Sequence, residues 1–143
     1  MTLDDLFYEI NKVSYDEKVR RGKRLYQSMI NTIEAHRYGY FFVSSTEVAF
    51  RYFTLFCGAD KKIKYDELNF YNAISGRNIS YDFFYNEAVE NHHPEMVADY
   101  KMFMGKLNQT EISYFQTLAA IVFSLKGNPT PDEKYYLLNF FRW

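Results

Sequence analysis

The stretch CGADKKIKYDEL at residues 57–68 carries side chains whose types and spacing could hold a metal ion. An EF-hand calcium loop needs oxygen ligands at positions 1, 3, 5, 7, 9 and 12 and a glycine at position 6. If Glu67 stands at position 12, Asp60 falls at position 5, but positions 1, 3 and 6 are occupied by Phe56, Gly58 and Lys61. The pattern therefore excludes an EF-hand and leaves at most a partial carboxylate site, which the neighbouring lysines oppose.

The same acids could instead mark the beginning of a helix. In a second polar loop, the segment TPDE at residues 130–133 supplies a capping threonine, a proline at the first helical position and acids that favour the helix dipole. Capping therefore explains the second loop well. In the first loop Lys64 precedes Asp66 and Glu67. A lysine side chain cannot accept the N–H bonds that an N-cap accepts, so capping explains this loop less completely.

The segment NHHPE at residues 91–95 also brings metal-capable side chains together, at the start of an expected helix. Either His92 with Glu95, or Glu95 with Asp99, could share a helix face. The segment matches no known ligand pattern, and two histidines before a helix-starting proline are more often solvated. A solvated helix start is the favoured interpretation.

One basic cluster occurs in the chain, and its members are Lys18, Arg20, Arg21, Lys23 and Arg24. On a helix, Glu17 can pair with Arg21 four residues further on. The cluster leaves a phosphate-binding role open. Flanking acids and the absence of a nucleic-acid-reading motif favour a solvated helix face instead.

The composition indicates one folded domain with an aromatic core. The chain has 143 residues, of which 48% are apolar and 20% are Phe, Tyr or Trp, so it should fold rather than stay disordered. With 17 basic and 18 acidic residues the formal charge is -1, and no global field attracts nucleic acid or anionic lipid. The only cysteine, Cys57, excludes an intrachain disulfide and is expected to be a buried small hydrophobe.

Capping residues and apolar periodicity predict helices along the whole chain. The expected helices cover residues 3–10, 14–36, 45–58, 65–74, 80–90, 94–107, 110–125 and 130–143. Residues 37–43, RYGYFFV, are ambiguous between a buried connector and a short extended piece. We predict an all-α fold, a compact single domain of about seven to eight helices over residues 1–143.

A weak internal repeat relates the two acidic loops. A shift of 66 residues places Asp66 on Asp132 and Glu67 on Glu133. At both places an apolar helix ends, a polar loop follows and an Asp-Glu pair begins the next amphipathic helix. Two such helix-loop-helix units predict two helix pairs around one core in a pseudo-two-fold arrangement.

An apolar helix, an A-D-(G)-x-I-x-x-x-E loop and a second helix, repeated about sixty residues on, resemble the TerB family of tellurite-resistance and stress-response proteins. The resemblance covers residues 45–143, and the helices of residues 1–44 are expected to pack on that part. It implies divalent-ion binding and an adaptor role in membrane-linked complexes, without enzymatic chemistry. The matching acids, which the resemblance implies as metal ligands, are Asp60, Asp66, Glu67, Asp132 and Glu133. Lys61, Lys62 and Lys126 depart from the family pattern.

These observations lead to a non-enzymatic binding domain as the expected function. The partner would be a protein that contacts an aromatic helix face, and a divalent cation at the acidic loops could tune the contact. The acidic N-terminal residues and the lack of a membrane-spanning run predict a soluble, cytoplasmic protein without direct membrane insertion. A surplus of aromatic residues suits a homodimer as well as a heterologous partner.

Two alternatives remain open. The first is a small nucleic-acid-associated or phage-type regulatory protein that uses the basic helix at residues 18–24. The second is a metal-dependent hydrolase that uses carboxylates together with His92 or His93.

Overall fold

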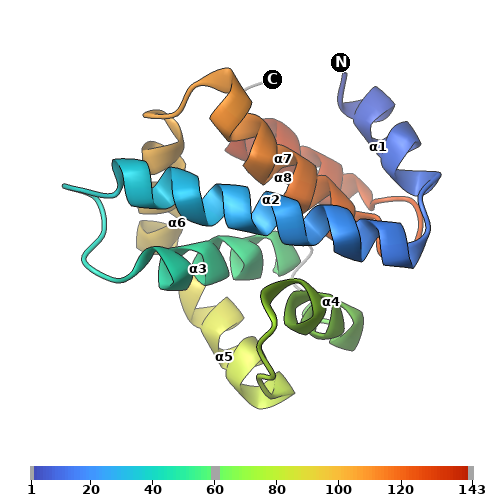
Figure 1. Ribbon diagram of the computed structural model, residues 1–143, viewed down its shortest axis with the longest axis horizontal. Coiled ribbons are helices and arrows are strands. Elements are labelled where there is room, and N and C mark those ends of the chain that lie inside the picture. Colours follow the sequence, from blue (N-terminus) through green and yellow to red (C-terminus); the bar gives the residue numbers. More distant parts are fainter. Residues whose placement is uncertain (1, 59–61, 142–143) are drawn as a thin grey trace.

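The computed structural model describes residues 2–58 and 62–141. Within these two ranges the chain forms eight α-helices and no β-strand (Figure 1). In chain order they are α1 (Leu3–Asn11), α2 (Tyr15–His36), α3 (Ser45–Cys57), α4 (Tyr65–Ser75), α5 (Tyr81–Asn91), α6 (Pro94–Met104), α7 (Gln109–Phe123) and α8 (Pro131–Phe140). The prediction of an all-α fold is confirmed.

The longest helix, α2, crosses the whole molecule in Figure 1 and packs against α3, α4 and α7. Ser14 caps it by accepting a hydrogen bond from the backbone N–H of Glu17 at 3.2 Å. At Gly22 the helix comes very close to α4, because a Cβ at that position would lie 2.9 Å from both Phe70 and Ile74. The small residue therefore sets how closely α2 and α4 pack.

The hydrophobic core is one cluster that draws residues from all eight helices and is rich in aromatic rings. Helix α3 lies at its centre, since every residue from Val48 to Cys57 except Arg51 is buried. Several tyrosines are buried together with their hydroxyls. The Tyr26 and Tyr71 hydroxyls bond to each other at 2.9 Å, and the Tyr52 hydroxyl donates to the Tyr100 carbonyl at 2.6 Å.

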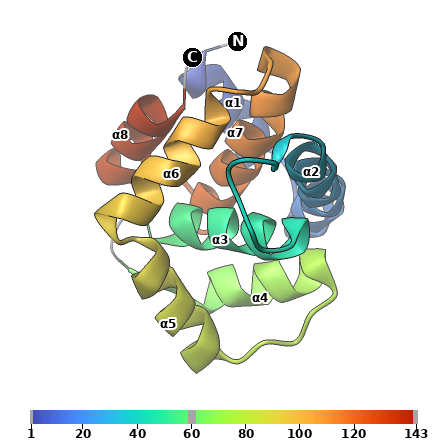
Figure 2. The ribbon, with the colours of Figure 1, turned by 90° about the vertical axis from the view of Figure 1, so that its left-hand side faces the viewer.

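The helix boundaries follow the repeat seen in the sequence. Helix α3 ends at Cys57 and α7 ends 66 residues later at Phe123, while α4 begins at Tyr65 and α8 begins 66 residues later at Pro131. Figure 2 shows α4 and α5 side by side beneath α3, and α6 leading from α5 to the other side of the molecule. The pseudo-two-fold relation between the two units stays a prediction.

Some boundaries differ from the sequence-based ones. Helix α6 ends at Met104, not at residue 107, because Gly105 follows and the next N–H groups bond to carbonyls three residues back. Helix α7 is capped by Asn108, whose side chain accepts from Glu111, so Thr110 already lies inside the helix. Helix α8 ends at Phe140.

Residues 37–43 form turns and no extended strand. Gly39 takes a φ of 86°, in the left-handed region, and Phe41 packs on the rings of Tyr100 and Phe103 at centroid distances of 5.3 and 5.0 Å. Phe42 points fully into solvent. Tyr40 and Val43 also pack against the core, so the segment is a turn held to the core by several side chains. None of the helices within the described ranges is both long and apolar enough to cross a bilayer.

Candidate functional site

The two acidic loops meet where the N-termini of α4 and α8 approach the end of α7. Glu67 and Glu133 are both buried, with 3% and 5% of their surface exposed, and both line one space of about 10 Å³. Asp66, Lys64 and Lys126 also line it. The structure thus brings together three of the five acids that the resemblance implies as metal ligands.

Each buried glutamate caps the helix that it begins. The Glu67 carboxylate accepts the backbone N–H of Lys64 at 2.8 Å, and the Glu133 carboxylate accepts that of Thr130 at 2.8 Å. In α8 the two residues form a complete capping box, because the Thr130 hydroxyl in turn accepts the backbone N–H of Glu133 at 3.2 Å. The protonated Lys64 side chain has no acceptor atom and cannot accept the backbone N–H of Glu67. Helix α4 therefore has only one of the two capping-box bonds, the one that the Glu67 carboxylate accepts. Helix capping therefore explains the position of both carboxylates.

Asp66 and Asp132, two further acids of the predicted set, are both exposed. Asp66 forms an exposed ion pair with Lys126 at 3.4 Å. Asp132 faces another hollow of about 440 Å³, between α6 and α8, where Val97 and Lys101 also lie. Asp60 lies outside the described residues. No group of three or more metal-capable His, Cys, Asp or Glu side chains occurs in the described part of the chain.

The histidine segment has a structural role, unlike the solvated role expected for it. The Nε2 atom of His92 lies 3.0 Å from the Leu55 carbonyl, and burial lowers the pKa of His92. Asn91 is also buried and donates to the Thr54 hydroxyl at 2.8 Å. His93 caps α6, and its side chain accepts the N–H of Glu95 at 3.4 Å. The segment fastens the α5–α6 corner to the end of α3.

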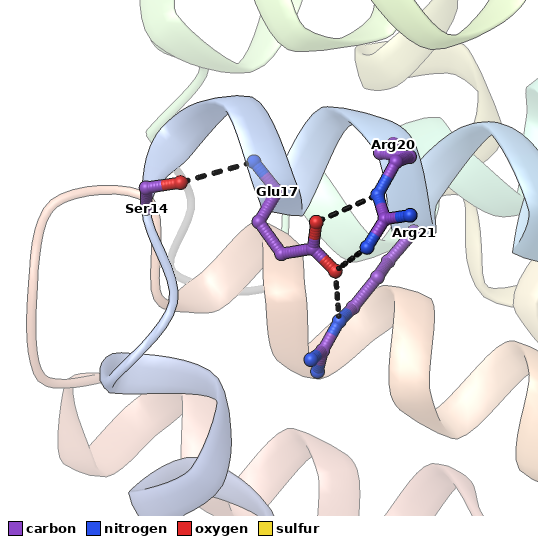
Figure 3. A network of polar contacts seen from close by, with 4 residues as sticks. All are labelled: Ser14, Glu17, Arg20 and Arg21. Carbon is purple, nitrogen blue, oxygen red and sulfur yellow. Dashed lines mark hydrogen bonds and ion pairs between the residues drawn. The ribbon is translucent and has the colours of Figure 1, made fainter.

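Three members of the basic cluster on α2 already have partners within the protein: Arg20 and Arg21 bond to Glu17, and Lys18 bonds to a buried backbone carbonyl. Figure 3 shows Glu17 holding two guanidinium groups, with Arg20 at 2.6 and 2.7 Å and Arg21 at 3.0 Å. The bonds from Arg20 and then Arg21 lower the pKa of Glu17 to about 2. Lys18 is buried and donates to the Ser124 carbonyl at 2.9 Å, which corrects its assignment to a solvated face. The predicted Glu17–Arg21 pair is confirmed.

A surface of aromatic residues lies where α5 passes the beginning of α4. The Tyr65 and Tyr81 rings stack at a centroid distance of 4.3 Å, and Tyr81 stacks with Tyr85 at 6.0 Å. The Tyr81 hydroxyl donates to the Ile63 carbonyl at 2.9 Å, which fixes the middle ring. We call Tyr65, Tyr81, Tyr85 and Val89 the tyrosine face. Tyr65 is 64% exposed, Val89 56% and Tyr85 44%.

The tyrosine face borders an apolar hollow of about 310 Å³. The residues that line it are Gly58, Ile63, Tyr85, Ala88, Val89 and His92. Gly58 is required at its floor, because a Cβ there would overlap the His92 ring. Fixed rings beside a hollow can bind an apolar group without first being ordered.

Only part of this surface was visible in the sequence. The aromatic run at residues 83–85 indicated a surplus of rings, and Phe83 and Tyr85 are indeed exposed while Phe84 is fully buried. The sequence carried no signal for Tyr65, which comes from α4 and meets α5 through the tertiary fold.

In comparisons with known proteins, no family model, no curated protein and no solved structure matches the chain. The resemblance to the TerB family therefore stays a prediction that depends on the two loops.

Proposed function

We propose that this chain is a non-enzymatic binding domain that recruits a partner protein through the tyrosine face. The observation that carries the proposal is the row of three stacked tyrosines beside an apolar hollow of about 310 Å³. Exposed aromatic anchors next to a pocket are typical of protein-interaction sites. An adaptor role, which the TerB resemblance implies, is consistent with such a surface, and we propose that the protein acts in the cytoplasm.

The fixed geometry of the tyrosine face supports this proposal further. The Tyr81 hydroxyl is bonded to the Ile63 carbonyl, and its ring is held between two others. A partner that binds here loses little side-chain entropy from this protein. Tyrosine also suits a surface that binds a partner reversibly, because its ring is apolar while its hydroxyl can be hydrated when no partner is bound.

Photo-crosslinking tests the proposal in the cell that naturally produces the chain. A benzophenone amino acid replaces Val89 in one variant and Asn31, an exposed residue of α2, in the control. We expect a discrete adduct with one other protein from position 89 and none from position 31. Adducts of equal yield from both positions, or none from position 89, would contradict the proposal. An adduct of two copies of the chain would make the face a homodimer interface.

A second property that one observation favours is a divalent cation in the space lined by Glu67 and Glu133, which we call the acidic junction. The space between Glu67 and Glu133 has a volume of about 10 Å³, which is close to what one water molecule or small ion needs. We expect millimolar calcium, magnesium, manganese or zinc to raise the melting temperature of the metal-stripped protein. An ion at about 100 times its dissociation constant adds roughly 2.7 kcal/mol to the stability of the native state.

The substitution Glu67→Gln should remove this rise, while the control Asp82→Asn on α5 should keep it. Equal melting temperatures with and without every ion would leave both glutamates as helix caps alone. The tyrosine face would be unaffected by that result, since it shares no residue with the junction.

A further inference from the structure

The chemistry of the partner can be inferred from the charges beside the tyrosine face. Between Arg77 and Lys101 the chain has no lysine or arginine but has five acids: Asp82, Glu87, Glu90, Glu95 and Asp99. All five lie on α5 and α6. Residues 78–100 are the longest segment of the chain without a lysine or arginine. This segment includes α5, the helix that carries Tyr85 and Val89.

Two neighbouring rows of side chains run along the outer side of α5. Residues four apart on a helix follow one another along its surface. One row therefore holds Tyr81, Tyr85 and Val89, and the adjacent row holds Asp82, Asn86 and Glu90. We call the second row the acidic ridge. All three of its members are exposed.

The carboxylates of the acidic ridge are available to a partner. Neither Asp82 nor Glu90 takes part in an ion pair with another described residue. By contrast, Glu17 on α2 already holds two arginines. A basic group that approached the ridge would therefore gain attraction without breaking an existing pair.

The hollow has the shape of a short groove along α5. Four of the residues that line it follow Tyr85 at intervals of a helix turn: Tyr85 itself, then Ala88, Val89 and His92, which stand three, four and seven residues after it. Such spacing exposes a strip along about two turns of helix. A partner helix that lies along this strip would insert apolar side chains spaced by three and four residues.

We propose that the partner's docking segment is an amphipathic helix with an apolar side that fills the hollow and a flank of Lys or Arg that meets the acidic ridge. The inference rests on the proposed function, because it names the chemistry of the partner at the same face. A membrane is a poorer occupant, since the ridge repels anionic lipid headgroups. The charge pairing sets the direction in which the partner helix lies along the hollow. It also raises the association rate constant at low salt.

Two synthetic helical peptides test this inference. They share leucines at positions spaced by three and four, but one carries lysines along the flank of the leucines and the other carries glutamates there. Binding to the full chain is followed by amide NMR shifts and by the anisotropy of a dye on the peptide. We expect the lysine peptide to bind about tenfold more tightly than the glutamate peptide at low salt, with shifts centred on Tyr85 and Val89.

The double substitution Asp82→Asn with Glu90→Gln should reduce that preference to less than about threefold. The control Glu9→Gln with Asp16→Asn removes two exposed carboxylates from α1 and α2 and should keep the preference. Equal affinity for the two peptides, shifts centred elsewhere, or no saturable binding of the lysine peptide would overturn the inference. If the peptides gave one of these results while position 89 still gave a crosslinked partner, the proposed function would stand and only the inferred chemistry of the partner would fail. If position 89 gave no adduct either, the proposed function and the inferred chemistry would both fail.

Discussion

His92 fills the space that Gly58 leaves open at the end of α3. Its Nε2 atom lies 3.0 Å from the Leu55 carbonyl, and because a carbonyl only accepts, this nitrogen carries a proton. Burial lowers the pKa of the imidazole from its usual 6.5. The ring is therefore neutral at pH 7, and it forms part of the lining of the hollow beside the tyrosine face.

The substitution His92→Gln should weaken the pH dependence of stability. Below pH 6.5 the unfolded chain takes up a proton that the folded chain resists, so wild-type stability falls as the pH drops from 7 towards 5. A glutamine amide can still donate a hydrogen bond but does not titrate. Urea unfolding at several pH values measures the difference. An unchanged slope in the variant would show that His92 is not the residue responsible.

Glu17 decides whether the basic helix can act as a nucleic-acid surface. Its carboxylate bonds to Arg20 and Arg21, so part of the cluster's positive charge is already compensated. We expect the wild-type protein to show no salt-sensitive binding to duplex DNA or RNA, as measured by fluorescence anisotropy. Binding that fell with salt, and was lost when Arg20, Arg21 and Arg24 were replaced by alanine, would revive the nucleic-acid alternative.

Residue roles that depend on distant partners could not be predicted. Lys18 belongs to an obvious basic cluster, yet its partner Ser124 is 106 residues away in the chain. His36 gave no signal in the sequence, yet it lies 2.9 Å from Glu111 on another helix. The hydrogen bond from the Asn108 backbone and then this contact lower the pKa of Glu111, against the effect of burial. The predicted Glu17–Arg21 pair was accessible because both residues lie on one helix.

Helices of this chain are specified mainly by local caps. Ser14, Ser44, Ser80 and Thr130 each accept a hydrogen bond from an amide three residues ahead, and such caps can be read from the sequence. The ends that were placed wrongly, at Met104 and around Asn108, depend on turns between packed helices. Local signals thus predicted the helices, whereas packing set the turns and the surface formed between α4 and α5.

Gly22 provides a test of packing between two helices. The substitution Gly22→Val should destabilise the fold by about 1–3 kcal/mol, because the added methyl groups overlap Phe70 and Ile74. Lys23→Val places the same side chain on the exposed side of α2 and should cost less than about 1 kcal/mol. Urea denaturation measures both. Equal losses would mean that β-branching, and not the contact with α4, is the cause.

Across the whole molecule the charge is unevenly distributed. The formal charge of -1 averages a basic cluster on α2 and an acidic ridge on α5. A net value near zero therefore says little about which partner each surface prefers, and only the fold shows which charges stand beside apolar groups. The same holds for the 14 tyrosines, some of which form the outer face while others lie in the core.

The buried tyrosines limit the alkaline range in which this protein can exist. Burial raises the pKa of Tyr26, Tyr52 and Tyr136 above the usual value of 10. Above that value the unfolded chain loses protons that the folded chain retains, so stability falls as the pH rises. Absorbance at the phenolate band during a base titration should therefore rise in two stages, exposed tyrosines first. The second stage should coincide with loss of helical circular dichroism, so that deprotonation of the core and unfolding become a single event.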